Sequence, residues 1–229
     1  MEVSIKNSTY EDFYATSDFH RVIVFNRIKI DSIMNHANSG EKWLLDIGCG
    51  TGDDTQILSR FADNCVGLDF SKKGLRQAKK KYPRLNLVCG DALHLPFRAR
   101  FFDKVFSSNI STYNTWDHSE ISKQLKEMYA QVRNDGFLVV LYSSFLLGKK
   151  EHNNEWKDLK VSDWEASLQI ANIKESSQLY YINPLVVVLL RKHSVSPTAS
   201  RISSILASIF TLFHTPGYIV VFCQRNGLI

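Results

Sequence analysis

The amino-acid sequence predicts an α/β protein built on a mainly parallel β-sheet. Short apolar runs, typical of buried strands, alternate with longer segments whose apolar residues have helical spacing. The first run, residues 43–47, leads directly into three alternating glycines, as expected for a strand that turns tightly into a helix. With 229 residues, 44% hydrophobic and 22% charged, the chain has the length and composition of one domain with a large core.

The predicted strands are short runs rich in apolar residues. They cover residues 43–47, 65–69, 85–89, 102–107 and 137–142, with a last strand at 217–223. Because helical patterns separate most of them, we expect parallel strands joined by right-handed crossovers.

The helices are predicted from apolar spacing and from capping residues. Apolar residues within 57–61 indicate a helix after the first strand, and Ser71 can cap the lysine-rich helix after the second. Residues 117–120, Asp-His-Ser-Glu, form a capping-box pattern that predicts a helix over about 118–132. The Asn-Asp-Gly sequence at 134–136 ends that helix.

Charge and composition argue against a nucleic-acid partner. The net charge is +5, and the basic residues are scattered apart from a run between Lys72 and Lys81, which is interpreted as one solvated helix face. A nucleic-acid-binding surface would need a basic stripe with interleaved aromatic residues, and the sequence has none.

The four cysteines predict neither a metal site nor a disulfide framework. Cys49, Cys65, Cys89 and Cys223 form no CxxC or His/Cys pattern. No apolar stretch reaches the roughly 20 residues that span a bilayer, and residues 1–10 lack the apolar core of a signal peptide. We therefore expect reduced thiols and a cytoplasmic location, at most peripheral to a membrane.

The glycine-rich stretch from Asp46 to Gly52 is the most informative part of the chain. Glycine lets the backbone turn tightly and approach a ligand with no Cβ in the way, and the following helix offers unpaired N–H groups. Asp69 ends the second strand 21 residues after Gly48, where a carboxylate can accept hydrogen bonds from both ribose hydroxyls. Asp91 follows the third strand and can reach the amine of an adenine. These groups share the carboxyl edge of the sheet and predict a nucleoside site.

A dinucleotide is the competing ligand for such a loop. Its GxGxxG pattern would require glycine at position 53, which is Asp53, and Asp54 follows. Two carboxylates at a helix start would repel a pyrophosphate. S-adenosylmethionine (SAM) has no phosphate and carries a positive sulfonium, so this acidity is compatible with SAM.

Five stretches, in order, resemble the motifs of class I SAM-dependent methyltransferases, and the chain is similar to their small-molecule "type 11" branch. They are residues 45–52, 66–71, 89–92, 101–108 and 129–137. The resemblance implies a Rossmann-like, seven-stranded, mostly parallel sheet of order 3-2-1-4-5-7-6, with strand seven antiparallel and helices on both faces. Many relatives have Gly-Gly where this chain has Asp135-Gly136.

The chain length predicts one domain over residues 1–229. Apolar residues at helical spacing over 11–36 predict that residues 1–40 are helical, and they are expected either to cover the site as a lid or to pack in the core. Residues 41–145 would form the SAM-binding core, and residues 146–229 the acceptor-side helices and antiparallel strands. The contacts that the resemblance implies are Asp46, Gly48, Cys49, Gly50 and Gly52 with methionine, Asp69 with ribose, Phe70, Asp91 and Ala92 with adenine, and Asn109 with the sulfonium.

Methyl transfer is an in-line displacement at an activated carbon, so the main task of the protein is to align donor and acceptor. A base is needed only where the acceptor loses a proton. Tyr113 and His94 are the candidate bases, although His94 also suits packing before Leu95-Pro96. Asp117 and His118 lie nearby, and helix capping is the favoured interpretation of both.

The acceptor is expected to be a small hydrophobic molecule, quinone-like or lipid-like, methylated at O, N or C. Residues 183–215 are rich in apolar side chains, and Ser196-Pro197 is a plausible cap and first turn. This segment is interpreted as packing on the sheet, as an entrance with membrane-surface contact, or as a dimer contact. The aromatic residues expected near the acceptor are Phe13, Tyr14, Phe19, Tyr113, Trp116, Tyr180 and Tyr181.

Two other functions remain open from the sequence. One is a non-catalytic SAM-binding scaffold. The other is a protein or nucleic-acid methyltransferase, which lacks support because no basic groove is predicted and the Asn-Pro-Pro-Tyr type motif is absent after the fourth strand.

Overall fold

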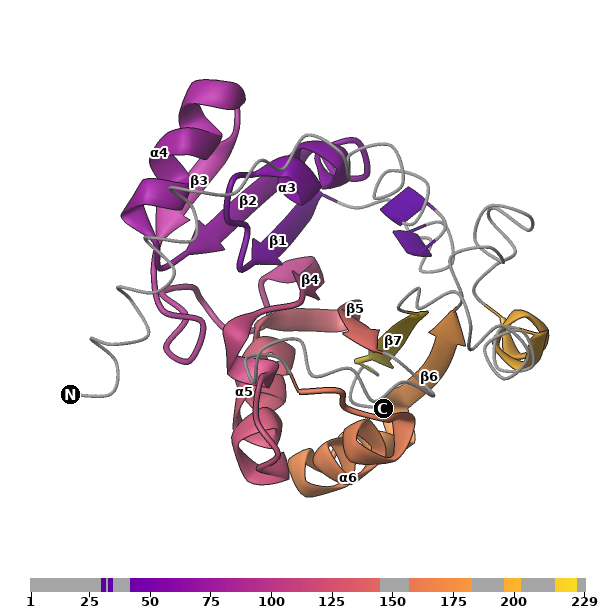
Figure 1. Ribbon diagram of the computed structural model, residues 1–229. Coiled ribbons are helices and arrows are strands. Elements are labelled where there is room, and N and C mark those ends of the chain that lie inside the picture. Colours follow the sequence, from indigo (N-terminus) through magenta and orange to yellow (C-terminus); the bar gives the residue numbers. More distant parts are fainter. Residues whose placement is uncertain are drawn as a thin grey trace.

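The computed structural model describes residues 30–31, 33–34, 42–144, 157–182, 196–202 and 217–225. A seven-stranded sheet runs through the centre in the order β3-β2-β1-β4-β5-β7-β6 (Figure 1). The strands are β1 (Trp43–Ile47), β2 (Asn64–Asp69), β3 (Asn86–Cys89), β4 (Phe102–Ser108), β5 (Val132–Ser144), β6 (Ser177–Ile182) and β7 (Gly217–Gln224).

The strand pairing confirms the predicted topology. In the series β3-β2-β1-β4-β5, each strand is parallel to its neighbour. Strand β7 is antiparallel to both of its neighbours, β5 and β6. The direction in which successive strands are added to the sheet reverses between β1 and β4. Strands β2 and β3 lie on one side of β1, whereas β4 lies on the other side. Open α/β sheets bind ligands at the carboxyl ends of the strands at such a switch point.

Helices cover both faces of this sheet. The described helices are α3 (Asp53–Leu58), α4 (Lys72–Lys81), α5 (His118–Gln131) and α6 (Val161–Ala171), with 3-10 turns η2 (Ser111–Tyr113) and η3 (Lys174–Ser176). In Figure 1, α3 and α4 lie on one side of the sheet, and α5 and α6 lie on the other. Successive residues of β1 therefore point to opposite faces of the sheet. Leu44 belongs to the same core cluster as Ile57 of α3, whereas Leu45 belongs to the cluster that contains Leu125 of α5.

Three predicted helix caps are confirmed. The Ser71 hydroxyl accepts a hydrogen bond from the Gly74 N–H at 3.0 Å, at the start of α4. The Asp117 carboxylate accepts one from the Ser119 N–H at 2.8 Å, at the start of α5. The Ser196 hydroxyl accepts one from the Ala199 N–H at 3.1 Å. Each bond satisfies an otherwise unpaired amide of the first helical turn.

The end of α5 and the start of β5 differ from the prediction. The helix ends at Gln131, and Val132 already pairs with Phe102 of β4 before the chain turns and resumes pairing at Phe137. The turn requires Gly136, because a Cβ at that position would lie 2.5 Å from the Asp103 carbonyl oxygen. Glycine is therefore needed at the second position of Asp135-Gly136.

Helix α6 and strand β6 were not predicted as separate elements. Trp164 of α6 and Tyr181 of β6 are buried in the same core cluster, and Tyr180 packs against Phe222 with ring centroids 6.0 Å apart. The expectation that Tyr180 and Tyr181 line the acceptor site is wrong, because pairing of β6 with β7 places both side chains in the core.

Candidate functional site

The glycine loop between β1 and α3 has a backbone that only glycine adopts easily. Gly48, Gly50 and Gly52 have φ values of 78°, 51° and 78°. The N–H groups of Gly48 and Cys49 both donate to the Leu68 carbonyl, at 2.8 and 3.0 Å. A left-handed conformation costs other L-residues roughly 1–2 kcal/mol. The predicted tight turn is therefore present, and it is anchored to the end of β2.

Close packing also requires two of these glycines. A Cβ on Gly48 would lie 2.1 Å from Cγ2 of Ile110, which follows β4. A Cβ on Gly52 would lie 2.9 Å from Leu85 Cδ1 and 3.1 Å from Ala78 Cβ of α4. The loop is thus held between the ends of β4 and α4.

Asp69 stands at the end of β2, and its carboxylate faces the loop. Its Oδ2 accepts a hydrogen bond from the Gly50 N–H at 2.8 Å, and its Oδ1 accepts one from the Ser71 N–H, also at 2.8 Å. The residue is only 4% exposed. Hydrogen bonds to a carboxylate are stronger than neutral ones, so Asp69 fixes the shape of the loop.

Asp46 is the buried carboxyl group at the base of the loop. Its Oδ2 accepts a hydrogen bond from the Thr55 hydroxyl at 2.6 Å. Burial raises the pKa of Asp46 to about 8, with a further upward contribution from the charges of Asp54 and Asp69, while the Thr55 hydrogen bond lowers it. At neutral pH this carboxyl is largely protonated, and a cation beside it would favour its ionised form.

Asp53, at the start of α3, joins the glycine loop to the end of α4. Its Oδ1 accepts hydrogen bonds from Lys81 Nζ and the Tyr82 hydroxyl, each at 2.6 Å, and its Oδ2 accepts one from the Thr51 hydroxyl at 2.9 Å. Burial alone would raise the pKa of Asp53, but these three hydrogen bonds lower it overall. Lys81 therefore offsets the charge of Asp53, one of the two carboxylates at the start of α3 that were predicted to repel a pyrophosphate.

The predicted adenine-side residues follow β2 and β3. Phe70 is half-buried directly after Asp69, and the Ala92 carbonyl accepts a hydrogen bond from Gln124 of α5 at 2.7 Å. Asp91 accepts hydrogen bonds from the Leu93 N–H at 2.9 Å and pairs with His94 Nδ1 at 3.0 Å. The His94 side chain is 75% exposed. The candidate base His94 is therefore a partner of the adenine-side carboxylate.

Asn109 and Ser143 meet across the carboxyl ends of β4 and β5. The Ser143 N–H donates to Asn109 Oδ1 at 2.8 Å, and Asn109 Nδ2 donates to Ser143 Oγ at 3.1 Å. Asn109 has φ 49° and is exposed, and Ile110 beside it contacts Gly48. Sequence analysis did not identify Ser143, because no motif marks it.

The candidate base Tyr113 lies in the core. It has no exposed surface, and its hydroxyl contacts Ser107 Oγ at 2.9 Å and Met128 Sδ at 3.3 Å. Its ring packs edge-on against Trp164, with centroids 5.0 Å apart. Burial raises the pKa of Tyr113 well above its usual range. This position does not support the role of a base, because the hydroxyl faces Ser107 and Met128 rather than an acceptor site.

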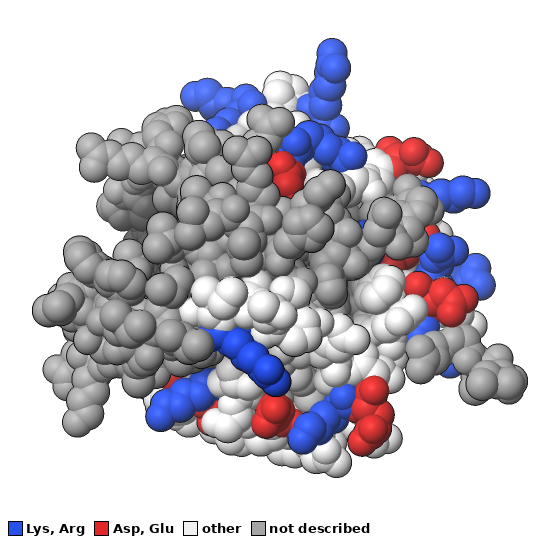
Figure 2. Space-filling view, turned by 90° about the vertical axis from the view of Figure 1, so that its right-hand side faces the viewer, with Lys and Arg blue, Asp and Glu red and all other residues white. Residues whose placement is uncertain are grey.

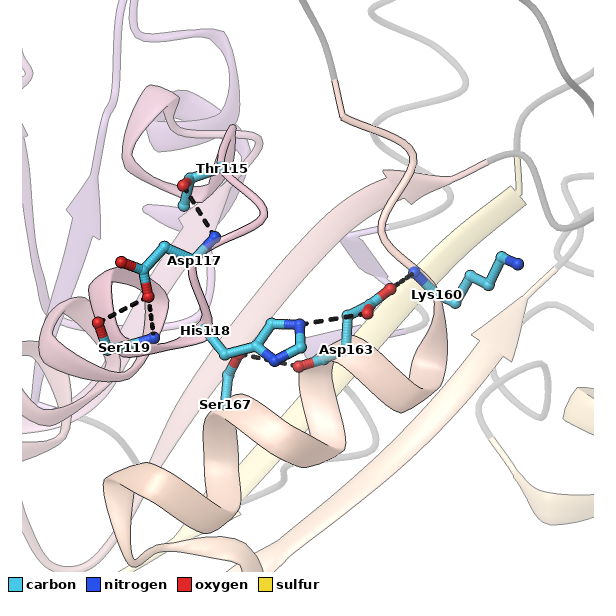
Figure 3. A network of polar contacts seen from close by, with 7 residues as sticks. All are labelled: Thr115, Asp117, His118, Ser119, Lys160, Asp163 and Ser167. Carbon is cyan, nitrogen blue, oxygen red and sulfur yellow. Dashed lines mark hydrogen bonds and ion pairs between the residues drawn. The ribbon is translucent and has the colours of Figure 1, made fainter.

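Asp117 caps a helix, as favoured from the sequence, whereas His118 does not cap a helix but pairs with a carboxylate of another helix. Asp117 caps α5, and His118 Nε2 lies 3.2 Å from Asp163 Oδ1 (Figure 3). The other oxygen of Asp163 accepts the Lys160 N–H at 2.7 Å at the start of α6. The pair therefore joins the N-terminal ends of α5 and α6.

Several predicted acceptor-side residues lie outside the described residues. These include the N-terminal lid up to residue 29 and the parts of 183–215 at 183–195 and 203–215. Trp116, in the loop between η2 and α5, is described, and it is 57% exposed. It is an exposed large hydrophobic residue in the segment that connects β4 to α5.

The described residues show mixed surface charge on one face (Figure 2) and contain no helix suited to cross a membrane. On the face shown in Figure 2, basic and acidic side chains of the described residues are interspersed and do not form a patch of one sign. Among the described residues, no helix has the length and apolar character needed to cross a membrane.

Comparison with known proteins identifies the same region. Residues 45–140 match a family model described as "Methyltransferase domain". A demethylmenaquinone methyltransferase of Lactobacillus johnsonii is 35% identical over 109 residues, which cover 44% of this chain and 43% of that protein. The phthiotriol/phenolphthiotriol dimycocerosates methyltransferase 1 of Mycobacterium ulcerans is 29% identical over 163 residues, which cover 69% and 54%. The chain thus spans about half the length of these relatives.

A solved structure shows the same fold over nearly the whole chain. The plantazolicin methyltransferase BpumL, in complex with SAH, superposes with a TM-score of 0.64, covers 96% of this chain and 90% of its own, and is 14% identical. Residues 45–140 therefore match a methyltransferase domain in sequence, and the chain shares the fold of this methyltransferase.

Proposed function

We propose that the protein is a SAM-dependent methyltransferase acting on a small, mainly hydrophobic acceptor. The observation that carries this proposal is the glycine loop at the carboxyl end of β1. Its three glycines have positive φ values, and the Asp69 carboxylate holds its central amide. The loop therefore has its ligand-binding shape through contacts of its own, and a bound ligand would not have to order it.

The residues of this chain fit SAM in charge as well as in shape. Asp46, Asp54 and Asp69 are acidic groups near the loop, and burial raises the pKa of Asp46 to about 8, so that this carboxyl is largely protonated at neutral pH. The ammonium and sulfonium groups of SAM would place positive charge beside these carboxyl groups. When bound, SAM would supply a methyl carbon that its sulfonium activates. We assign Asp46, Gly48, Cys49, Gly50 and Gly52 to the methionine side of the ligand.

Asp69 can hold the loop and a ribose together. A carboxylate has about four acceptor positions, and two backbone N–H groups occupy two of them. We assign Asp69 to the ribose, because its carboxylate stands at the end of β2, where the motif resemblance places the ribose hydroxyls. We assign Phe70, Asp91 and Ala92 to the adenine side and Asn109 to the sulfonium side, in keeping with their places at the carboxyl ends of the strands.

The chain is proposed to act by alignment rather than by a general base. Tyr113 is buried against Ser107, and His94 is paired with Asp91 on the adenine side, so neither is proposed as a base. Holding donor and acceptor in line converts a bimolecular step into a unimolecular one, and this can supply most of the acceleration for an already activated methyl group.

The acceptor is proposed to be quinone-like or lipid-like. Two relatives are named for a demethylmenaquinone and for phthiotriol dimycocerosates, and Trp116 offers an exposed aromatic surface in the segment between β4 and α5. Ligand sites for such molecules are mainly apolar with a few polar groups. Contact of residues 183–215 with a membrane surface, and a cytoplasmic location, remain part of this proposal.

The test is SAM binding followed by methyl transfer. Calorimetry should show SAM and SAH binding, and labelled SAM should transfer its methyl group to at least one of 1,4-naphthohydroquinone, 1-naphthol and catechol. The Gly48→Ala variant serves as the binding-deficient control. Tight binding with no transfer to these compounds would favour the scaffold alternative, and absence of binding would refute the proposal.

A further inference from the structure

Polar groups with an unused hydrogen-bond donor at the carboxyl edge of the sheet are candidates for binding an acceptor. Ser143 is such a group, and neither the motifs nor the comparisons assign it a role. It lies on β5 and contacts the side chain of Asn109, which directly follows β4. The Asn109 N–H donates to the Leu141 carbonyl at 3.0 Å, so the backbone holds the two residues beside each other.

The direction of the hydrogen bonds between the two side chains follows from the backbone. A backbone N–H can only donate, so the Asn109 atom 2.8 Å from the Ser143 N must be the carboxamide oxygen. The amide nitrogen is then the atom 3.1 Å from Ser143 Oγ, and it must donate to that oxygen. The Ser143 hydroxyl therefore accepts from Asn109, and its own proton points to another partner.

The described residues provide no acceptor for this proton. Ser143 Oγ makes the single contact with Asn109, and Ser143 is half-buried while Asn109 is exposed. Ile110, next to Asn109, packs against Gly48 of the glycine loop. The Ser143 hydroxyl thus lies near the proposed donor side of the site, and its position is set by a positive-φ residue that two hydrogen bonds hold in place.

We propose that the Ser143 hydroxyl binds the methyl acceptor by donating a hydrogen bond to a phenolic, quinol or carbonyl oxygen. This rests on the proposed methyltransferase function. Asn109 is a positioning residue, because it occupies one lone pair of Ser143 Oγ and so directs the proton. A mainly apolar acceptor needs few polar contacts to set its orientation, and one hydroxyl donor at the end of β5 would provide one of them.

The test compares two ligands that differ by one oxygen. Equilibrium dialysis of the SAH-loaded protein would measure binding of 1-naphthol and of naphthalene. The wild-type protein should prefer 1-naphthol, and Ser143→Ala should weaken 1-naphthol binding roughly three- to tenfold while leaving naphthalene unchanged. Ser143→Thr, which keeps the hydroxyl, should retain the preference.

Asn109→Asp provides the matched test of the positioning role. The aspartate would still accept the Ser143 N–H, but its second oxygen would accept the Ser143 hydroxyl proton in place of donating to it. The preference for 1-naphthol should therefore be lost, although Ser143 is intact. Thermal unfolding of each variant monitors folding.

The proposal is overturned if the wild-type protein does not prefer 1-naphthol, or if Ser143→Ala weakens both ligands equally or neither. SAH calorimetry on the same samples keeps the two proposals separate. Normal SAH binding with no 1-naphthol preference would refute the role of Ser143 alone, whereas absent SAH binding would refute the proposed function.

Discussion

The backbone N–H of Gly50 donates a hydrogen bond to Asp69 Oδ2 over 2.8 Å, so the end of β2 holds the middle of the glycine loop. The two residues are 19 positions apart in the chain. The carboxylate therefore contributes to the shape of the site before any ligand is bound.

Asp69→Asn should weaken both folding and SAM binding. The carboxamide offers one oxygen to two backbone N–H groups, and its own NH₂ would face the second of them. A buried unsatisfied donor costs about 1–3 kcal/mol of folding free energy. SAM affinity should fall about ten- to hundredfold. Denaturant unfolding and calorimetry measure the two effects, with the exposed Asp63→Asn as control. Unchanged SAM affinity would remove Asp69 from the proposed site.

Gly48→Ala should destabilise the loop through two separable effects. The left-handed backbone costs roughly 1–2 kcal/mol, and the new Cβ would overlap Ile110 Cγ2. A double-mutant cycle with Ile110→Ala removes the overlap but not the backbone cost. Gly48→Ala should therefore lower the free energy of unfolding less in the Ile110→Ala background than in the wild type. Equal losses of unfolding free energy in the two backgrounds would mean that movement of the loop relieves the overlap.

Asp46→Asn should flatten the dependence of stability on pH. The pKa of Asp46 rises from 3.8 to about 8 on folding, so the folded protein retains a proton that the unfolded chain releases. This group therefore makes the wild-type protein less stable as the pH rises from about 4 to about 8, with no further loss above. Asparagine keeps the size but does not titrate. Urea unfolding across this range, compared between variant and wild type, should show the difference in slope, and parallel curves would contradict it.

Lys81→Met should destabilise the protein more than Lys80→Met. Lys81 binds Asp53, whereas Lys80, at the preceding position of α4, is exposed. Because both partners are partly exposed, the expected loss of folding free energy is below about 1 kcal/mol, and this loss should be smaller at high salt. Thermal unfolding at low and high salt measures it. Equal effects of the two substitutions would show that the Asp53 contact contributes nothing measurable.

Tyr113→Phe should leave the methyl-transfer rate and its pH profile unchanged. The hydroxyl contacts Ser107 and Met128 in the core, so its removal should cost about 1 kcal/mol of folding free energy. Labelled-SAM assays below the unfolding temperature separate the two effects. A loss of transfer of about a hundredfold or more at unchanged stability would restore Tyr113 as a base.

Local pattern determined the elements that carry the site. Residues within a few positions of each other are enough to predict these features. They are the apolar run before Gly48, the carboxylate at the end of the next strand, and the helix caps Ser71 and Asp117. These features depend on backbone sterics and on hydrogen bonds to nearby amides, so the sequence predicts them well. The strand order required the family resemblance, since alternation of strands and helices does not specify which strands pair.

Tertiary structure alone decided which of the predicted side chains are buried in the core. Tyr113 and Tyr181 are polar aromatics that suit a binding site by composition, yet pairing of the strands and packing of α5 and α6 bury both. Ser143 has no sequence signal, because its partner Asn109 is 34 positions away and meets it only when β4 pairs with β5. The spacing of apolar residues along the chain predicts which residues share a face of a helix or strand. Contacts between residues distant in the chain depend on strand register and on packing, and neither can be predicted from single positions.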